Sequence, residues 1–175
     1  MSKDVKIRKG VNIKLEGEAE KVHATFPISS TVALRPTDFS GLTPKLLLKQ
    51  GAEVKAGTPV FFNKANEKVL FTSPVSGEIA EIRRGEKRKI LEVVILADKE
   101  TKYEEFGAGD PSAMSREDVV DKWLKSGCWP FIRQRPYDVI ANPDEEPKAI
   151  FISAFDSSPL APDNDFIIRG EGEAF

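Results

Sequence analysis

Four side chains between residues 129 and 135 combine aromatic faces with fixed positive charge: Trp129, Phe131, Arg133 and Arg135. Prolines at positions 130 and 136 restrict the backbone and predict an extended segment. Aromatic rings and guanidinium donors suit a flat ligand whose carbonyl oxygens accept hydrogen bonds. The alternative is structural, because such rings fill seams between elements and arginines pair with nearby acids. Neither interpretation makes the four residues catalytic.

Composition argues against a metal centre and excludes an internal disulfide. The chain has one cysteine, Cys128, and one histidine, His23, too few for an iron–sulfur cluster or for a zinc site rich in nitrogen and sulfur. Three aspartates lack the spacing of a calcium loop and are typical of turns and helix caps: Asp156, Asp163 and Asp165. We therefore expect no metal bound by this chain.

The charge balance and the glycine pattern exclude further classes of partner. The 26 Lys and Arg residues against 28 Asp and Glu residues give a net charge of −2, which argues against nucleic-acid binding. Gly170 and Gly172 lack the third glycine of a dinucleotide loop. The most apolar run, residues 91–97, is too short to cross a membrane. We expect a soluble or peripheral protein that binds no cofactor of its own.

A second charged feature is a basic segment around Glu86. Its cations are Arg83, Arg84, Lys87, Arg88 and Lys89. Such a hairpin suits an acidic partner protein or anionic lipid headgroups. A solvated turn that guards a sheet edge explains the same residues, so both interpretations remain open.

The elements that position these side chains begin with short strands. Residues 1–36 alternate apolar and polar side chains, and the run from Val22 to Phe26 makes His23 a strand residue. Residues 46–97 repeat the pattern more densely between the turn residues Gly51, Gly57, Gly77 and Gly85. Many short strands with glycine turns predict a small sandwich or barrel.

The pattern changes after about residue 98. Ser115 is placed to cap a helix that Gly127 ends, with an apolar face of Val119, Val120, Trp123 and Leu124. Residues 142–147 are typical of a linker, and residues 149–153 of a buried strand. Because a buried strand needs neighbours, we interpret the chain as a fragment. The expected division is a β domain over residues 1–98, a helical connector over 99–147 and the start of an α/β domain over 148–175.

Two glycine-bounded segments suggest a more specific fold. Residues 49–61 have the form G-x-x-V-x-x-G-x-x-V, and residues 72–82 read TSPVSGEIAEI. Together they resemble the biotinyl and lipoyl domains, which are flattened barrel-sandwich hybrids that present a modified lysine at a hairpin tip. Here Lys64 and Lys68 occupy the hairpin without flanking methionines, so solvated surface charge is the preferred interpretation.

Further segments in the same order extend the resemblance along nearly the whole chain: residues 85–88, 115–117, 124–129, 133–136, 149–156 and 159–161. Together they resemble the A subunits of sodium-translocating NADH:quinone oxidoreductases. The C subunits of Rnf electron-transfer complexes and the NADH-binding subunit of respiratory complex I are similar more distantly. Full A subunits are considerably longer, so the chain resembles their N-terminal part.

The resemblance implies a peripheral subunit on the cytoplasmic side of the bacterial inner membrane. Electrons in such a complex pass from NADH through flavins and iron–sulfur centres in partner subunits to quinone, coupled to Na⁺ export. The fragment alone is expected to be inactive, with Trp129, Phe131, Arg133 and Arg135 as contacts to quinone or to a partner protein of the complex. The alternatives are a biotin or lipoyl carrier modified at Lys64 or Lys68, and a non-catalytic scaffold of an Rnf-type complex.

Overall fold

The computed structural model describes residues 6, 9–10, 13–17, 20–27, 29–153, 156, 158 and 160–170. The chain forms two compact units, which are described separately. The larger comprises residues 27–146, and the smaller comprises residues 1–26 with residues 147–175.

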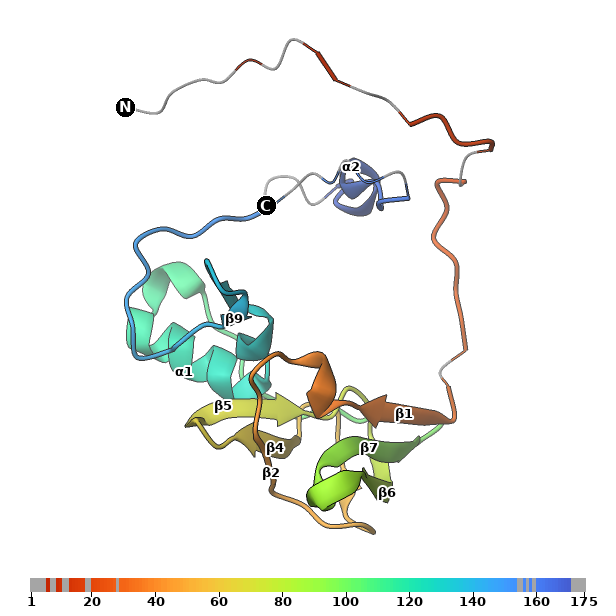
Figure 1. Cartoon of the computed structure of the whole chain (residues 1–175), viewed down its shortest axis with the longest axis vertical. Coiled ribbons are helices and arrows are strands. Elements are labelled where there is room, and N and C mark those ends of the chain that lie inside the picture. The colour runs from red at the N-terminus through yellow and green to blue at the C-terminus, as the bar shows by residue number, and fades with distance from the viewer. Residues whose placement is uncertain are drawn as a thin grey trace. The chain divides into compact units, whose positions relative to one another are not determined.

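Two antiparallel sheets form the β core of the larger unit (Figure 1). The first has four strands in the order β1-β7-β6-β3, with bounds Thr31–Leu34, Ile90–Ala97, Gly77–Arg84 and Glu53–Val54. The second has the order β2-β4-β5, with bounds Pro44–Leu46, Pro59–Asn63 and Asn66–Thr72. This β-rich, barrel-sandwich architecture confirms the fold class predicted from the glycine-punctuated alternation.

The core of this unit is formed by apolar side chains from both sheets. Phe61 on β4 and Phe71 on β5 are paired across the strands, and their rings stack at a centroid distance of 4.7 Å. The remaining fully buried apolar side chains of the strands are Val60, Val69, Ile79, Val93 and Ile95. Burial of rings and branched side chains on facing strands supplies the main stabilisation of this unit.

The segment after β7 is strapped to the barrel by backbone and side-chain hydrogen bonds. Ser76, which is buried, donates through Oγ to Asp98 Oδ2 at 2.9 Å and accepts from the Lys102 N–H at 2.9 Å. Further along, Thr58 Oγ1 donates to Glu104 Oε1 at 2.9 Å. The connection from strand to helix is therefore ordered against the sheets.

Helix α1, Arg116–Ser126, begins and ends where its sequence predicts. Ser115 Oγ accepts from the Asp118 N–H at 3.1 Å, and Gly127 takes the left-handed conformation, with φ of 76°, that ends a helix. Leu124 is buried against the barrel core. Trp123 is 46% exposed, so the buried face of the helix is narrower than the apolar face predicted from the sequence.

Residues 129–141 turn back on themselves beside α1. A short 3-10 helix, Trp129–Phe131, precedes β8 at Arg133–Gln134, which pairs with β9 at Val139–Ile140. The prediction of an extended segment from residue 129 was therefore wrong for its first three residues. Pro130 in the first turn restricts φ to a value that a helical turn shares with an extended chain.

The smaller unit contains one short helix, α2, at Asn164–Ile167 among its described residues. Asp163 caps it through Oδ1, which accepts from the Phe166 N–H at 3.0 Å, as the capping interpretation predicts. Asp156 accepts from the backbone N–H and hydroxyl of Ser158 in a local turn. His23 lies in no strand and stacks on Phe166 at a centroid distance of 4.7 Å.

Several strand predictions in the smaller unit were wrong. Ile13 and Leu15 are exposed and lie in no strand, and Val5, Ile7 and Val11 fall outside the described residues. The apolar run of residues 149–153 also lies in no strand, with Phe151 90% exposed. Alternating or apolar residues make a segment suitable for a strand. A strand forms only where a neighbouring strand is available to satisfy its backbone hydrogen bonds.

Candidate functional site

The strongest candidate site is the aromatic-basic hairpin, defined here as residues 129–141. Arg133 pairs with Ile140 and Gln134 with Val139 in antiparallel register, which leaves residues 135–138 as the tip. Asp138 at this tip has a positive φ of 53°, a conformation that Asp adopts more readily than most residues. The short ladder holds alternate side chains on opposite faces of the hairpin.

The two predicted aromatic residues have different environments. Trp129 is 7% exposed, belongs to the barrel core, and donates from Nε1 to the Ala141 carbonyl oxygen at 2.8 Å. Its buried ring fills the seam between barrel and helix, as the structural interpretation expected. Phe131 is 75% exposed, and its ring meets the edge of Phe39 at a centroid distance of 6.2 Å. Of the two, only Phe131 therefore presents an aromatic face to an incoming partner.

Both predicted arginines share one carboxylate. Arg133 Nε lies 3.7 Å from Asp138 Oδ1, and Arg135 Nη1 lies 3.6 Å from the same oxygen. Two guanidinium groups against one carboxylate leave a net positive charge on this face of the hairpin. The side chain of Arg135 is 79% exposed, whereas that of Arg133 is 33% exposed.

The opposite face of the hairpin is braced by the turn at residues 142–145. Gln134 Oε1 accepts from the Asn142 N–H at 3.1 Å, and Gln134 Nε2 donates to Glu145 Oε2 at 3.3 Å. Arg116, in the first turn of α1, donates to the Glu145 carbonyl oxygen at 3.2 Å. This segment is a packed turn, and its Asn-Pro-Asp composition, which suggested a linker, also suits a tight turn.

The same turn reaches the barrel through Asp144. Its carboxylate forms an ion pair with Lys68 and accepts from Asn66 Nδ2 at 3.4 Å. The hydrogen bond from Lys68 lowers the pKa of Asp144, while partial desolvation opposes the shift. Lys64, at the hairpin turn between β4 and β5, is exposed. Of the two carrier-lysine candidates, Lys68 is thus engaged by a side chain 76 residues away.

Sequence reasoning missed Tyr137 and Asp138. Tyr137 is 83% exposed at the hairpin tip, and Asp138 is the acid that both arginines share. The available signal was the Pro136-Tyr137-Asp138 run, because Pro and Asp are typical of tight turns. A turn there brings Asp138 back toward Arg133 and Arg135.

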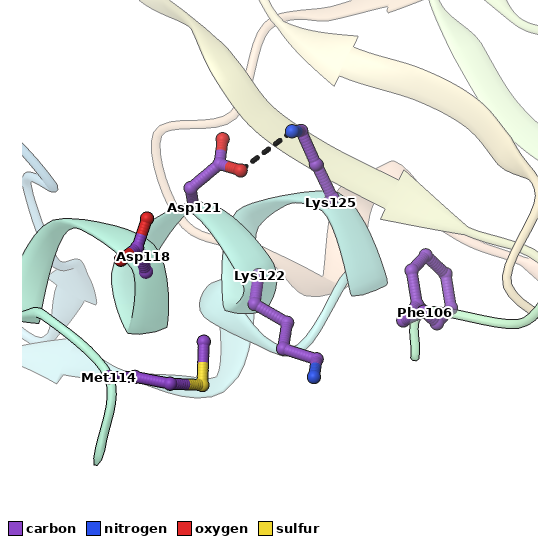
Figure 2. Close-up of a pocket in the computed structure, with 6 residues that line it drawn as sticks. All are labelled: Phe106, Met114, Asp118, Asp121, Lys122 and Lys125. Atoms are coloured by element: carbon purple, nitrogen blue, oxygen red, sulfur yellow. Dashed lines mark ion pairs between the residues drawn. The ribbon is translucent and has the colours of Figure 1, made fainter. Parts of the chain in front are cut away.

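A shallow groove of 310 Å³ lies along α1 (Figure 2). Its lining residues are Phe106, Met114, Asp118, Asp121, Lys122 and Lys125. Asp121 and Lys125 form an ion pair of 2.6 Å one helical turn apart, drawn as a dashed line in Figure 2. The groove is open and mixes charges of both signs with two apolar side chains, so it has no arrangement typical of catalysis.

The described part of the chain holds neither a metal-ligand cluster nor a membrane-spanning helix. Within those residues, no group of three or more His, Cys, Asp or Glu side chains is placed to hold a metal ion. No helix of the same part is long and apolar enough to span a bilayer.

Comparisons with known proteins agree with the geometry. Residues 5–98 match the model of the NqrA N-terminal barrel-sandwich hybrid domain, and residues 114–175 match that of the NqrA second alpha/beta domain. Proteins named as the A subunit of Na(+)-translocating NADH-quinone reductase from Neisseria meningitidis serogroup A, Yersinia pseudotuberculosis serotype O:1b and Neisseria gonorrhoeae are each 39% identical over 173 residues.

These alignments cover 98% of this chain but 39% of each relative. The chain thus spans about two fifths of the length of the curated relatives it matches. The first family model covers the residues of both sheets, where the observed strands form the barrel-sandwich hybrid. From the fold and from the matches to two successive domain models, the chain belongs to the NqrA family of Na⁺-translocating NADH-quinone reductase A subunits.

Proposed function

We propose that this chain is the N-terminal part of the A subunit of a sodium-pumping NADH:quinone reductase. It is peripheral, lies on the cytoplasmic side of the bacterial inner membrane, and supports electron transfer from NADH to quinone coupled to Na⁺ export. NADH, flavin and iron–sulfur centres belong to partner subunits. Family membership and the names of the relatives support this assignment.

The aromatic-basic hairpin is the surface of this chain that contacts another protein of the pump. The observation that carries this proposal is the exposure of Phe131 and Tyr137, at 75% and 83%, together with that of Arg135 on the same hairpin. Aromatic residues and arginine are enriched where protein interfaces bury their centres. The buried Trp129 and the braced opposite face hold the hairpin in one conformation, which lowers the entropy cost of docking.

Assembly of the complete pump tests this contact. Phe131→Ser combined with Tyr137→Ser is expected to weaken co-purification of the full-length A subunit with its partners and to reduce NADH:quinone activity in proportion. Tyr103→Ser is the matched control, because Tyr103 is 70% exposed in the same unit but outside the hairpin. Normal assembly by the double variant would contradict the proposal. A thermal unfolding midpoint equal to that of the parent shows that the variant folds.

Quinone contact by the same hairpin is the second candidate function. It is favoured by Arg133 and Arg135, two guanidinium groups that share one carboxylate on the hairpin that also exposes Phe131. A photoreactive quinone followed by peptide mapping is expected to label residues 129–136, and Arg133→Ala is expected to reduce that labelling. Labelling confined to other parts of the pump would leave contact between subunits as the function of this hairpin.

A further inference from the structure

A second surface of the larger unit, separate from the aromatic-basic hairpin, concentrates positive charge. It is named here the cationic tip and consists of Arg84, the last residue of β6, and the connection to β7 at residues 85–89. The Gly85 N–H donates to the Lys89 carbonyl oxygen at 2.8 Å, and the Lys89 N–H donates to the Glu86 carbonyl oxygen at 3.1 Å, which closes the turn. Every residue of the tip except Gly85 is exposed.

Arg83, the residue before the tip, is paired with carboxylates, whereas the cations of the tip are not. Arg83 on β6 pairs with Glu81 and Glu92 at 2.9 Å each. Glu92 also lies 3.7 Å from Arg35 Nε. Within the part of the chain that the structure describes, no carboxylate lies within ion-pair distance of the four tip cations, Arg84, Lys87, Arg88 and Lys89. The single acid of the tip is Glu86, so the tip is strongly positive in a chain whose net charge is −2.

The tip also holds two long basic side chains in an unfavourable backbone conformation. Lys87 has φ of 53° and Arg88 has φ of 61°, both in the left-handed region. Glycine or asparagine adopts this conformation at lower cost. Long basic side chains at such positions are a reason to look for a function of those side chains. The turn points both cations away from the barrel core, since neither residue is buried. Leu91, at the start of β7, adds an apolar side chain that is 38% exposed beside Gly85.

We propose that the cationic tip binds an anionic phospholipid surface. Phosphodiester headgroups accept hydrogen bonds from Lys and Arg and supply the negative charge that the tip lacks. A convex turn of six residues offers little area for a protein interface, which commonly buries roughly 800 Å² on each partner. A charged membrane surface needs no such area, because each cation near it adds to the attraction. The inference rests on the proposed membrane assignment, and it identifies the face that meets the lipid.

Vesicle binding by the whole 175-residue chain tests the tip directly. Flotation with phosphatidylcholine vesicles is compared with flotation with vesicles that also contain phosphatidylglycerol. The triple variant Lys87→Gln, Lys89→Gln and Arg88→Gln is expected to lower the partition coefficient on anionic vesicles on the order of 100-fold. The parent is also expected to lose binding as salt increases, because screening weakens surface electrostatics.

The matched control removes the same charge elsewhere in the same unit. Lys49, Lys64 and Lys99 are exposed, and the triple variant with glutamine at these positions keeps the cationic tip intact. Retained binding by this control supports a local site. Equal loss in both variants would overturn the tip assignment, and so would absence of parent binding to anionic vesicles. Unchanged vesicle binding by the tip variant, with weakened co-purification with partner subunits, would instead assign the tip to an acidic protein.

The outcome is separable from that of the proposed function. The tip variant leaves the aromatic-basic hairpin unchanged, so assembly of the pump by hairpin variants and quinone labelling report on that hairpin alone. Equal unfolding midpoints for parent and variant show that the loss concerns binding and not folding.

Discussion

Gly77 lies at the start of β6, where the strand approaches β7 too closely for any side chain. Its φ is +150°, and a Cβ added there lies 1.9 Å from the Leu96 carbonyl oxygen. The obstacle is backbone in a paired strand, so it cannot rotate away. The sequence marks this glycine as a turn residue, but its proximity to Leu96 follows only from the pairing of the two strands.

Gly77→Ala is expected to lower the free energy of unfolding by about 3 kcal/mol or more, because the clash forces β6 away from β7. Gly41→Ala is the matched control, since Gly41 has φ of +75° but has no atom within 4 Å of an added Cβ. Its cost is limited to the left-handed conformation, about 1 kcal/mol. Urea unfolding of both variants measures the difference. Equal losses would show that conformation, and not close approach, determines the cost.

For single residues, the sequence predicted contacts between near neighbours in the chain, but not contacts between residues that the fold brings together. Ser115 and Gly127 were identified as the ends of α1 because capping depends on side chains within a few residues. The arginine partner Asp138 and the lysine partner Asp144 were missed. Their contacts depend on how a hairpin and a turn fold back, which no short pattern in the sequence encodes.

Among the elements, the turn at residues 142–145 connects several partners. It contacts β5 through Asp144, α1 through Glu145 and β8 through Asn142. The barrel, the helix and the aromatic-basic hairpin are therefore fixed to one another through one turn. Its composition predicted a linker, whereas the contacts of the folded chain make it a packed turn.

The pairing of Asp144 with Lys68 predicts a pH dependence of stability. Because the pKa of Asp144 is lowered in the folded state, its carboxylate stabilises the fold above its unfolded pKa. That contribution is lost as the pH falls through the folded pKa. Asp144→Asn is thus expected to be less stable than the parent at neutral pH, with the difference shrinking on acidification. Urea unfolding across acidic to neutral pH measures it.

Two comparisons isolate the pair. Glu146→Gln removes a neighbouring exposed carboxylate that is outside the turn and is expected to leave the pH dependence unchanged. Lys68→Gln is expected to reproduce the effect of Asp144→Asn, and the double variant to add little to either change. A pH-independent difference between parent and Asp144→Asn would contradict the assignment.

For the whole molecule, the fold class was predictable and the second unit was not. Glycine-bounded alternation indicated the barrel-sandwich because its strands pair with neighbours close in sequence, as β4 with β5 and β6 with β7. The apolar run at residues 149–153 indicated a buried strand equally well, yet these residues lie in no strand and those at 150–152 are largely exposed. Hydrophobic character shows that a segment is suited to burial, but not which partner covers it.

The division into units predicts where proteases act first. Phe26 and Phe151 are 80% and 90% exposed and lie in no helix or strand, whereas Phe61 is buried in β4. Brief chymotrypsin digestion is expected to cut after Phe26 and Phe151 and to leave a piece that contains residues 27–146. Mass spectrometry of the early products identifies the cuts.

Phe151→Ser serves as the comparison for this digestion. It removes the chymotrypsin site and leaves the sequence of the larger unit unchanged. The early cut near residue 151 is expected to disappear. First cuts within the two sheets would contradict the division. An unchanged unfolding midpoint for the isolated piece would show that the larger unit folds independently.

The seam filled by Trp129 also gives the chain an optical probe. The sequence has two tryptophans, and their environments differ: Trp129 is 7% exposed and hydrogen-bonded, whereas Trp123 is 46% exposed on α1. Iodide is expected to quench Trp123 and not Trp129 in the folded chain, so emission that resists quenching would identify Trp129. Loss of that protected, blue-shifted emission reports the moment at which the hairpin leaves the barrel, without any added label.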